Sequence, residues 1–214
     1  MVLWRLAGVA IATCAAGETP EELAHAFVNR VAKQSEIPGI AVGVVKAGQS
    51  VFMEGFGVLG QGSNDTVGPH SLFQMGSCTK TFIVMGLAHF VSRSDSGITW
   101  ETNVHEITKG KFNASVSYMT ENLNLGDLLA HRTGYGDHSG DLVWALGGVD
   151  SEQSLIEDRL PHLKPTKTIR ELFMYSNIGY EIATVALEAI AGEAWYTFVE
   201  RTFLQPLGMS ETFL

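Results

Sequence analysis

The chain has 214 residues, of which 45% are hydrophobic and 17% are charged, and its formal net charge is −9. This length and hydrophobic content suffice for one sizeable packed domain and exclude a globally disordered chain. The acidic charge argues against a nucleic-acid partner, because such proteins usually carry a basic face. No apolar run reaches the roughly 18 residues that cross a membrane, so no membrane span is expected.

The N-terminus has the features of a secretory signal peptide. One basic residue, Arg5, precedes an apolar run from Leu6 to Ala12, and the small residues that follow end at Ala16. Signal peptides are cleaved after such small residues. We therefore expect residues 1–16 to be removed, residues 17–214 to form the domain, and the protein to be secreted or periplasmic.

A helix followed by a hairpin is predicted next. Thr19-Pro20-Glu21-Glu22 has the form of a capping box with proline at the first helical position, and the apolar spacing continues to about Gln34. Two β-rich runs, Ile40–Lys46 and Ser50–Val58, flank Ala47-Gly48-Gln49. This pattern is typical of a β-hairpin.

The glycines in GFGVLG, at positions 55, 57 and 60, match the spelling of a dinucleotide-binding loop. Such a loop works only if its glycines open a helix whose N-terminus holds the pyrophosphate. Here the polar residues from Gln61 to Asp65 follow and cannot continue as a helix. We therefore interpret the glycines as turn residues and expect no cofactor.

Ser77 and Lys80 lie three residues apart, at the start of a predicted apolar helix over Phe82–Val91. Residues with this spacing are neighbours on one helix face. Two interpretations remain open. In one, Ser77 caps the helix while Lys80 extends to solvent; in the other, Ser77 is a nucleophile and Lys80 its activator.

The nucleophile interpretation has a physical basis. A serine N–H where a loop becomes a helix lies at the positive end of the helix dipole, where it can bind an oxyanion. The hydroxyl must also lose its proton to attack. A lysine one turn further on can take that proton if burial makes its neutral form accessible.

Residues 100–165 have a mixed pattern, with one short helix predicted over Gly126–His131 and broken by Gly134 and Gly136. A metal site could be sought at two histidines and two aspartates in and after this segment, His131, Asp137, His138 and Asp141. Their spacing matches no common zinc pattern. We interpret the segment as a polar loop and expect no metal.

The last third is strongly helical, with helices predicted over Ile178–Ala191 and Ala194–Leu204 and a break at Gly192. The fold class is therefore α+β, but with very little sheet. Two strands alone are marginally stable, and their unpaired edges favour pairing with further strands.

A second motif, Tyr175-x-Asn177, lies between an apolar run and a helix start, so Asn177 could serve as an N-cap. It occurs once, as does Ser77-x-x-Lys80, and a mostly helical segment separates them. Together the motifs resemble those of the serine β-lactamase and penicillin-binding-protein superfamily. The chain is most similar to the class C β-lactamase and esterase branch.

The resemblance extends over nearly all of residues 20–214. Five segments resemble family landmarks in the same order, and they read IPGIAVGVVKAGQSVFMEGFGV, SLFQMGSCTKTF, LGDLLAHRTGY, FMYSNIGY and FLQPLGMSETFL. It implies that Ser77 is acylated, that Lys80 takes or relays its proton, and that Tyr175 is the general base. It also implies that Asn177 binds the substrate amide or the lysine. A phenol ordinarily titrates near pH 10, so a tyrosine base needs neighbouring positive charge.

The sequence departs from the family at its C-terminal end. The family has a third motif, Lys or His followed by Thr or Ser and Gly, on a strand well beyond the segment that resembles PLGM. No such tripeptide follows Met209. The resemblance thus implies that later sheet strands are missing, and it is compatible with a fragment, a truncated gene model or a short isoform.

Two functions remain open at this point. The resemblance implies a serine hydrolase that forms an acyl-enzyme on a small-molecule or peptide substrate containing an amide or ester. The missing third motif favours a catalytically inactive isoform or pseudoenzyme with a binding role. The sequence predicts neither the individual substrate nor the oligomeric state.

Overall fold

The computed structural model describes residues 19–136 and 155–214. The chain divides into two compact units, Met1–Gln74 and Met75–Leu214, each of which is described by itself. The predicted signal peptide lies outside the described residues. So do Asp137, His138 and Asp141 of the segment considered above as a metal site.

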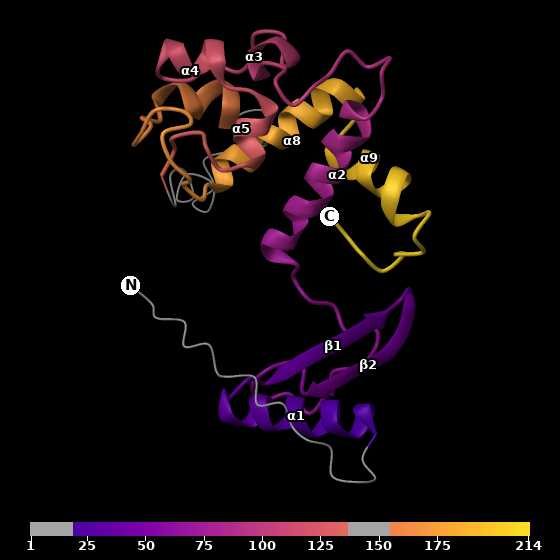
Figure 1. The fold of residues 1–214 in the computed structure, drawn as a ribbon. Helices are drawn as coiled ribbons and strands as arrows, with labels where there is room; N and C mark the ends of the chain where they lie inside the picture. The colour runs from indigo at the N-terminus through magenta and orange to yellow at the C-terminus, as the bar shows by residue number, and fades with distance from the viewer. Residues whose placement is uncertain (1–18, 137–154) are drawn as a thin grey trace. The chain divides into compact units, whose positions relative to one another are not determined.

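The first unit contains a helix, α1 (Pro20–Gln34), and two antiparallel strands, β1 (Gly39–Lys46) and β2 (Gln49–Gly57). The predicted capping box is present, since the N–H of Glu22 donates to the Thr19 hydroxyl at 3.2 Å and the Glu22 carboxylate accepts from the Thr19 N–H. Within this unit α1 packs on β2, where the His25 ring lies 5.1 Å from that of Phe56 (Figure 1).

The hairpin turn follows from the backbone conformation of two residues. Ala47 and Gly48 both have positive φ angles, of 50° and 77°. Two consecutive residues with positive φ form the tight turn whose twist matches that of paired strands. The predicted hairpin is confirmed, with strand boundaries within one residue of those expected.

The interpretation of Gly55 and Gly57 as turn residues is wrong, because both lie in β2. Their role is close backbone approach. A Cβ at Gly57, whose φ is 76°, would overlap the carbonyl oxygen of Pro38, and a Cβ at Gly55 would overlap that of Val67. Neither glycine opens a helix.

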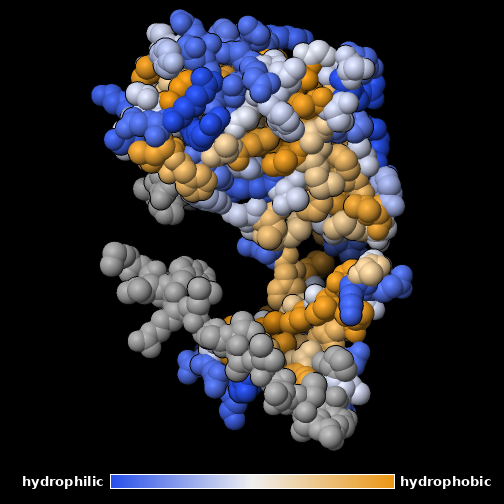
Figure 2. Space-filling model, viewed as in Figure 1, coloured by the Kyte–Doolittle hydropathy of each residue, from blue (hydrophilic) through white to orange (hydrophobic). Residues whose placement is uncertain are grey.

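The described residues of the first unit form a sheet of two strands. Much of this hairpin is apolar and exposed, including Val45 and Met53, and Figure 2 shows apolar surface over this unit. A two-stranded sheet with exposed apolar side chains is marginally stable by itself. The sequence predicts an α+β fold with very little sheet, and this prediction is confirmed for the described part of the chain.

The second unit is helical. Its elements in chain order are η1 (Gly76–Cys78), α2 (Thr79–Val91), α3 (Val104–Ile107), α4 (Ser117–Asn122), α5 (Leu125–Leu129), η2 (Leu155–Arg159), η3 (Leu160–His162), α8 (Asn177–Ala191), α9 (Trp195–Val199) and η4 (Glu200–Leu204). The long helices match the sequence prediction. The helix predicted over Gly126–His131 ends instead at Leu129, and the short helices α3 and α4 were not predicted.

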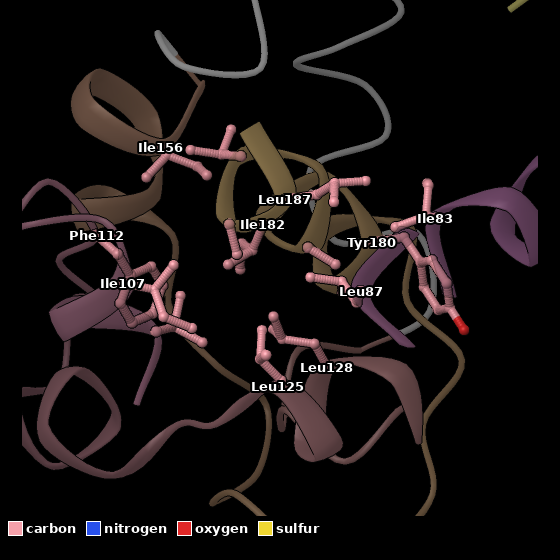
Figure 3. Close-up of a cluster of buried hydrophobic side chains, with 14 of the residues drawn as sticks. Ile83, Leu87, Ile107, Phe112, Leu125, Leu128, Ile156, Tyr180, Ile182 and Leu187 are labelled. Carbon is pink, nitrogen blue, oxygen red and sulfur yellow. The ribbon is translucent and has the colours of Figure 1, made fainter. Parts of the chain in front are cut away.

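Helix α8 is the centre of this unit, since it packs against α2, α3, α5 and α9 (Figure 1). Figure 3 shows apolar side chains from several elements converging on it. The fully or nearly fully buried members include Ile83, Leu87, Leu125, Leu128, Ile182 and Leu187. The close packing of α2 on α8 fixes the relative positions of their first turns, where the candidate site lies.

The predicted break after α8 occurs at Gly192, whose left-handed φ of 75° ends the helix. Among the described helices, none is long and apolar enough to cross a membrane alone. One pair bent by 69°, Asn177–Ala191 with Trp195–Leu204, passes the length and composition test together.

Tyr135 provides a stability test of the second unit. Its side chain is fully buried, and its hydroxyl has no hydrogen-bond partner among the described residues. An unsatisfied buried polar group costs about 1–3 kcal/mol. We expect Tyr135→Phe to raise the free energy of unfolding by about 1 kcal/mol in urea titrations at neutral pH. A loss of stability would show that the hydroxyl has a partner.

The same substitution should change the response to alkali. Burial raises the pKa of Tyr135 well above the ordinary value of a phenol, so the folded state favours the neutral form. A group with a raised folded pKa stabilises fully below its unfolded pKa, and that contribution is lost as the pH rises above about 10. Wild-type stability should fall more steeply above that pH than the stability of Tyr135→Phe.

Candidate active site

Ser77 and Lys80 lie at the N-terminal end of α2. Ser77 is in the turn η1 directly before the helix, and Lys80 is the second residue of the helix itself. Neither η1 nor α2 has a side-chain capping hydrogen bond. Instead, the Lys80 ammonium donates to Ser77 Oγ at 3.2 Å. The serine hydroxyl is thus engaged by the lysine and does not cap the helix.

Tyr175 and Asn177 lie at the start of α8, whose first residue is Asn177. Asn177 is not the N-cap, because that position is Ser176 and makes no side-chain capping bond. Lys80 Nζ donates to Asn177 Oδ1 at 2.8 Å, and Tyr175 Oη lies 2.5 Å from Ser77 Oγ. The structure therefore brings all four predicted residues into contact, although their catalytic roles remain predictions.

The donors and acceptors of these side chains decide the direction of the hydrogen bond between Lys80 and Ser77. A lysine ammonium has three donors and no acceptor, so Ser77 Oγ accepts from Lys80. Ser77 Oγ is also in hydrogen-bond contact with Tyr175 Oη, and either hydroxyl can be the donor in that contact. The contact between Ser77 and Tyr175 is thus one across which a proton can move, and Lys80 holds the serine oxygen from the other side.

A second phenol, Tyr180, also lies beside Lys80 and was missed in the sequence. Lys80 Nζ is 5.3 Å from the Tyr180 ring centroid and 5.1 Å from that of Tyr175. The Tyr180 hydroxyl donates to the Leu129 carbonyl oxygen at 3.2 Å, and burial, with a contribution from Tyr175, raises the pKa of Tyr180. Tyr180 therefore stays a neutral phenol, which leaves Tyr175 as the candidate base.

His131 is also part of the site, which corrects the interpretation of its segment as a polar loop. The side chain is buried, with 9% of its surface exposed. Its ring centroid lies 4.5 Å from that of Tyr175 and 5.2 Å from that of Tyr180. No local pattern in the sequence signals this burial, which depends on the later segment that packs over it.

A buried carboxylate holds this region together. Asp127 is fully buried, and its oxygens accept from Arg132 at 3.0 Å and from two nitrogens of Arg170 at 2.7–3.1 Å. Arg132 follows His131 directly, and Arg170 lies five residues before Tyr175. Asp127 therefore joins the two segments that carry the aromatic part of the site.

Backbone hydrogen bonds continue this connection. The Arg170 N–H donates to the Arg132 carbonyl oxygen, and the Met174 N–H donates to that of His131, both at 2.8 Å. Gly134 has a φ of 86°, and a Cβ there would overlap the carbonyl oxygen of Lys167. The two segments lie close enough that only glycine fits at this position.

Within residues 19–136 and 155–214, no group of three or more His, Cys, Asp or Glu side chains is arranged to hold a metal ion. The site consists instead of the Lys80 side chain, which donates hydrogen bonds to Ser77 and Asn177, and of Tyr175, which contacts Ser77. Such a set can move a proton between a serine hydroxyl and the oxygen of a tyrosine that lies beside a positive charge.

Comparisons with known proteins identify the family and the fold of the chain. A family model described as Beta-lactamase matches residues 24–214. An Unguisins hydrolase of Aspergillus violaceofuscus is 30% identical over 185 residues, which cover 84% of this chain and 32% of that protein. The chain thus spans about a third of the length of this relative.

Two solved structures have the same fold at low sequence identity. A class C β-lactamase aligns with a TM-score of 0.74 at 19% identity, over 92% of this chain and 52% of that one. A penicillin-binding-protein homologue from Pyrococcus abyssi aligns with a TM-score of 0.70 at 20% identity, over 87% of this chain and 42% of that one. The predicted α+β fold of the β-lactamase and transpeptidase type is therefore confirmed, and the chain belongs to the β-lactamase family, within the serine β-lactamase and penicillin-binding-protein superfamily.

Proposed function

We propose that this chain carries the nucleophilic centre of a serine hydrolase that forms an acyl-enzyme on an amide or ester. The observation that carries the proposal is the position of Ser77 Oγ, which lies 3.2 Å from Lys80 Nζ and 2.5 Å from Tyr175 Oη. A nucleophile in contact with both a positioning cation and a proton acceptor is the arrangement that covalent catalysis requires.

In the acylation step, Tyr175 acts as a phenolate beside the Lys80 ammonium, and Ser77 Oγ forms a bond to the substrate carbonyl carbon while its proton passes to Tyr175 Oη. The carbonyl oxygen becomes an oxyanion, which we expect the Ser77 N–H at the start of α2 to stabilise together with the helix dipole. Collapse of this intermediate breaks the bond to the leaving group, which takes the proton from Tyr175. Water then attacks the acyl-enzyme while Tyr175 accepts its proton, and collapse breaks the bond to Ser77 Oγ, which takes that proton back as the acid is released.

Asn177 and Lys80 form the polar support of this centre. The 2.8 Å contact between Lys80 Nζ and Asn177 Oδ1 joins the first turn of α2 to the first residue of α8. We assign Asn177 to positioning Lys80, and its amide to substrate binding. The substrate class that fits this chemistry is a small molecule or peptide with a hydrolysable amide or ester, and a secreted protein is consistent with it.

A non-catalytic binding role is the second candidate. It concerns the 214 residues tested by themselves, within which no Lys/His-Thr/Ser-Gly tripeptide follows Met209. In the family that motif supplies a second oxyanion donor, and loss of one such donor typically lowers turnover by about a hundred- to a thousandfold. Reactivity at Ser77 distinguishes the two candidates.

The test is covalent labelling with a fluorophosphonate probe, followed by mass spectrometry of the labelled peptide. We expect a single adduct on Ser77 and none on Ser77→Ala. Cys78→Ala is the control, because Cys78 is an exposed thiol next to the serine, and this variant should label normally. Labelling that survives Ser77→Ala would overturn the nucleophile assignment, and an unlabelled wild-type chain would support the binding role.

A further inference from the structure

We propose that His131 is a positioning residue that holds Tyr175 in place for proton transfer from Ser77. This inference rests on the proposed function and extends it to a residue outside the two sequence motifs. It concerns how the candidate base is aligned, since Tyr175 is an exposed side chain at the start of α8 and needs external support.

His131 binds the backbone on both sides of Tyr175. Its carbonyl oxygen accepts from the N–H of Met174 at 2.8 Å, and its Nδ1 accepts from the N–H of Ser176 at 3.1 Å. The second bond is buried. One residue thus holds the Phe173–Met174 peptide group, which precedes Tyr175 by one residue, and the Tyr175–Ser176 peptide group directly after it, and these two bonds restrict the direction of the Tyr175 Cα–Cβ bond.

The His131 ring also packs on the phenol itself. The ring centroids of His131 and Tyr175 are 4.5 Å apart with an interplanar angle of 31°. Phe173 and Tyr180 contact the same imidazole at 5.4 Å and 5.2 Å. Because three aromatic rings contact the imidazole, it cannot rotate freely. The imidazole in turn restricts the orientation of the Tyr175 ring that packs against it.

The hydrogen bond from the Ser176 N–H also indicates the protonation state and the tautomer of the His131 imidazole. An imidazole nitrogen that accepts a hydrogen bond carries no proton, so the neutral ring has its proton on Nε2. The protonated ring has donors at both nitrogens and cannot accept from the Ser176 N–H. The contact therefore belongs to the neutral Nε2–H tautomer alone.

The backbone of His131 explains which substitutions test this role. Its φ is 54°, in the left-handed region that asparagine tolerates better than most residues. Asparagine also places its Oδ1 near the position of the histidine Nδ1. His131→Asn therefore preserves an acceptor for Ser176 while removing the ring, whereas His131→Leu removes both the acceptor and the aromatic ring.

His89 is the matched control. It lies in α2, the helix that carries Lys80, and it also packs among aromatic rings, those of Phe90, Phe198 and Phe203. Substituting it changes a half-buried histidine in the same unit without touching Tyr175. His89→Leu and His89→Asn thus report the effect of losing a packed histidine as such.

The experiment measures the rate constant for fluorophosphonate labelling of Ser77, together with thermal unfolding, for all four variants and the wild type. We expect His131→Leu to label roughly a hundredfold more slowly, as for a misplaced catalytic group. His131→Asn should stay within about tenfold of wild type, the factor that loss of an aromatic contact explains. Both His89 variants should label at the wild-type rate, even where they unfold at a lower temperature.

Each other result has a definite meaning. Wild-type labelling by His131→Leu, or equal slowing by His131→Leu and His89→Leu, overturns the positioning role while the proposed function stands. If the wild-type chain does not label, the proposed function fails, and ¹⁵N NMR of its histidines decides the contact separately. An unprotonated, hydrogen-bonded Nδ1 at neutral pH supports the inference, and a protonated Nδ1 overturns it.

Discussion

Replacing Tyr175 with phenylalanine is expected to lower the rate of covalent labelling at Ser77 by about a thousandfold, the middle of the range for general acid–base catalysis. The substitution removes only the oxygen that lies 2.5 Å from Ser77 Oγ. The ring that packs on His131 remains. The proton of Ser77 then has no acceptor at this distance, so the hydroxyl attacks slowly.

Tyr180→Phe is the control for this prediction, since both phenol rings contact Lys80. The Tyr180 hydroxyl donates to the Leu129 carbonyl and does not contact Ser77. Its loss should leave the labelling rate close to that of wild type. If both variants slow labelling equally, Tyr175 has no special role, and if neither does, Lys80 is the better candidate for the base.

The largest expected effect on stability comes from Asp127→Ala, which should lower the free energy of unfolding by about 3 kcal/mol, the low end for breaking a buried ion pair. The carboxylate is fully buried and binds both Arg132 and Arg170. Both arginine side chains are more than 40% exposed, so water can solvate them after the change. This exposure places the cost at the low end.

Asp95→Ala is the matched control for Asp127→Ala. Asp95 accepts two hydrogen bonds from Arg93, but both side chains are exposed. Exposed ion pairs contribute little to stability because water solvates each partner. Urea unfolding should therefore show no measurable change for Asp95→Ala. An equally small change for Asp127→Ala would show that the buried pair does not hold the segments around the site together.

Much of the fold was predictable because its signals are local. The Thr19–Glu22 capping box, the hairpin turn at Ala47-Gly48 and the end of α8 at Gly192 each depend on a few adjacent residues. The short helices were not predictable in this way. The helix α3, for example, begins where Asn103 binds both the following turn and the Glu121 carbonyl, 18 residues away.

Only those residues of the candidate site that belong to the two motifs could be predicted from the sequence. Ser77-x-x-Lys80 and Tyr175-x-Asn177 indicated four residues, and the structure brings them into contact. His131 could not be found by spacing, because its burial is produced by residues 173–180, more than 40 positions later. The glycines and polar residues around it favoured a loop, which hid its contacts with the Tyr175 segment.

The central claim is that Ser77 is acylated, and one measurement tests it most directly. The chain and its Ser77→Ala variant are incubated with a penicillin-type substrate or an activated ester, quenched in acid and analysed by peptide mass spectrometry. We expect the mass of one acyl group on the peptide that contains Ser77, at Ser77 itself, and none on the variant. The absence of an adduct, or an equal adduct on both chains or on Cys78, would contradict the claim.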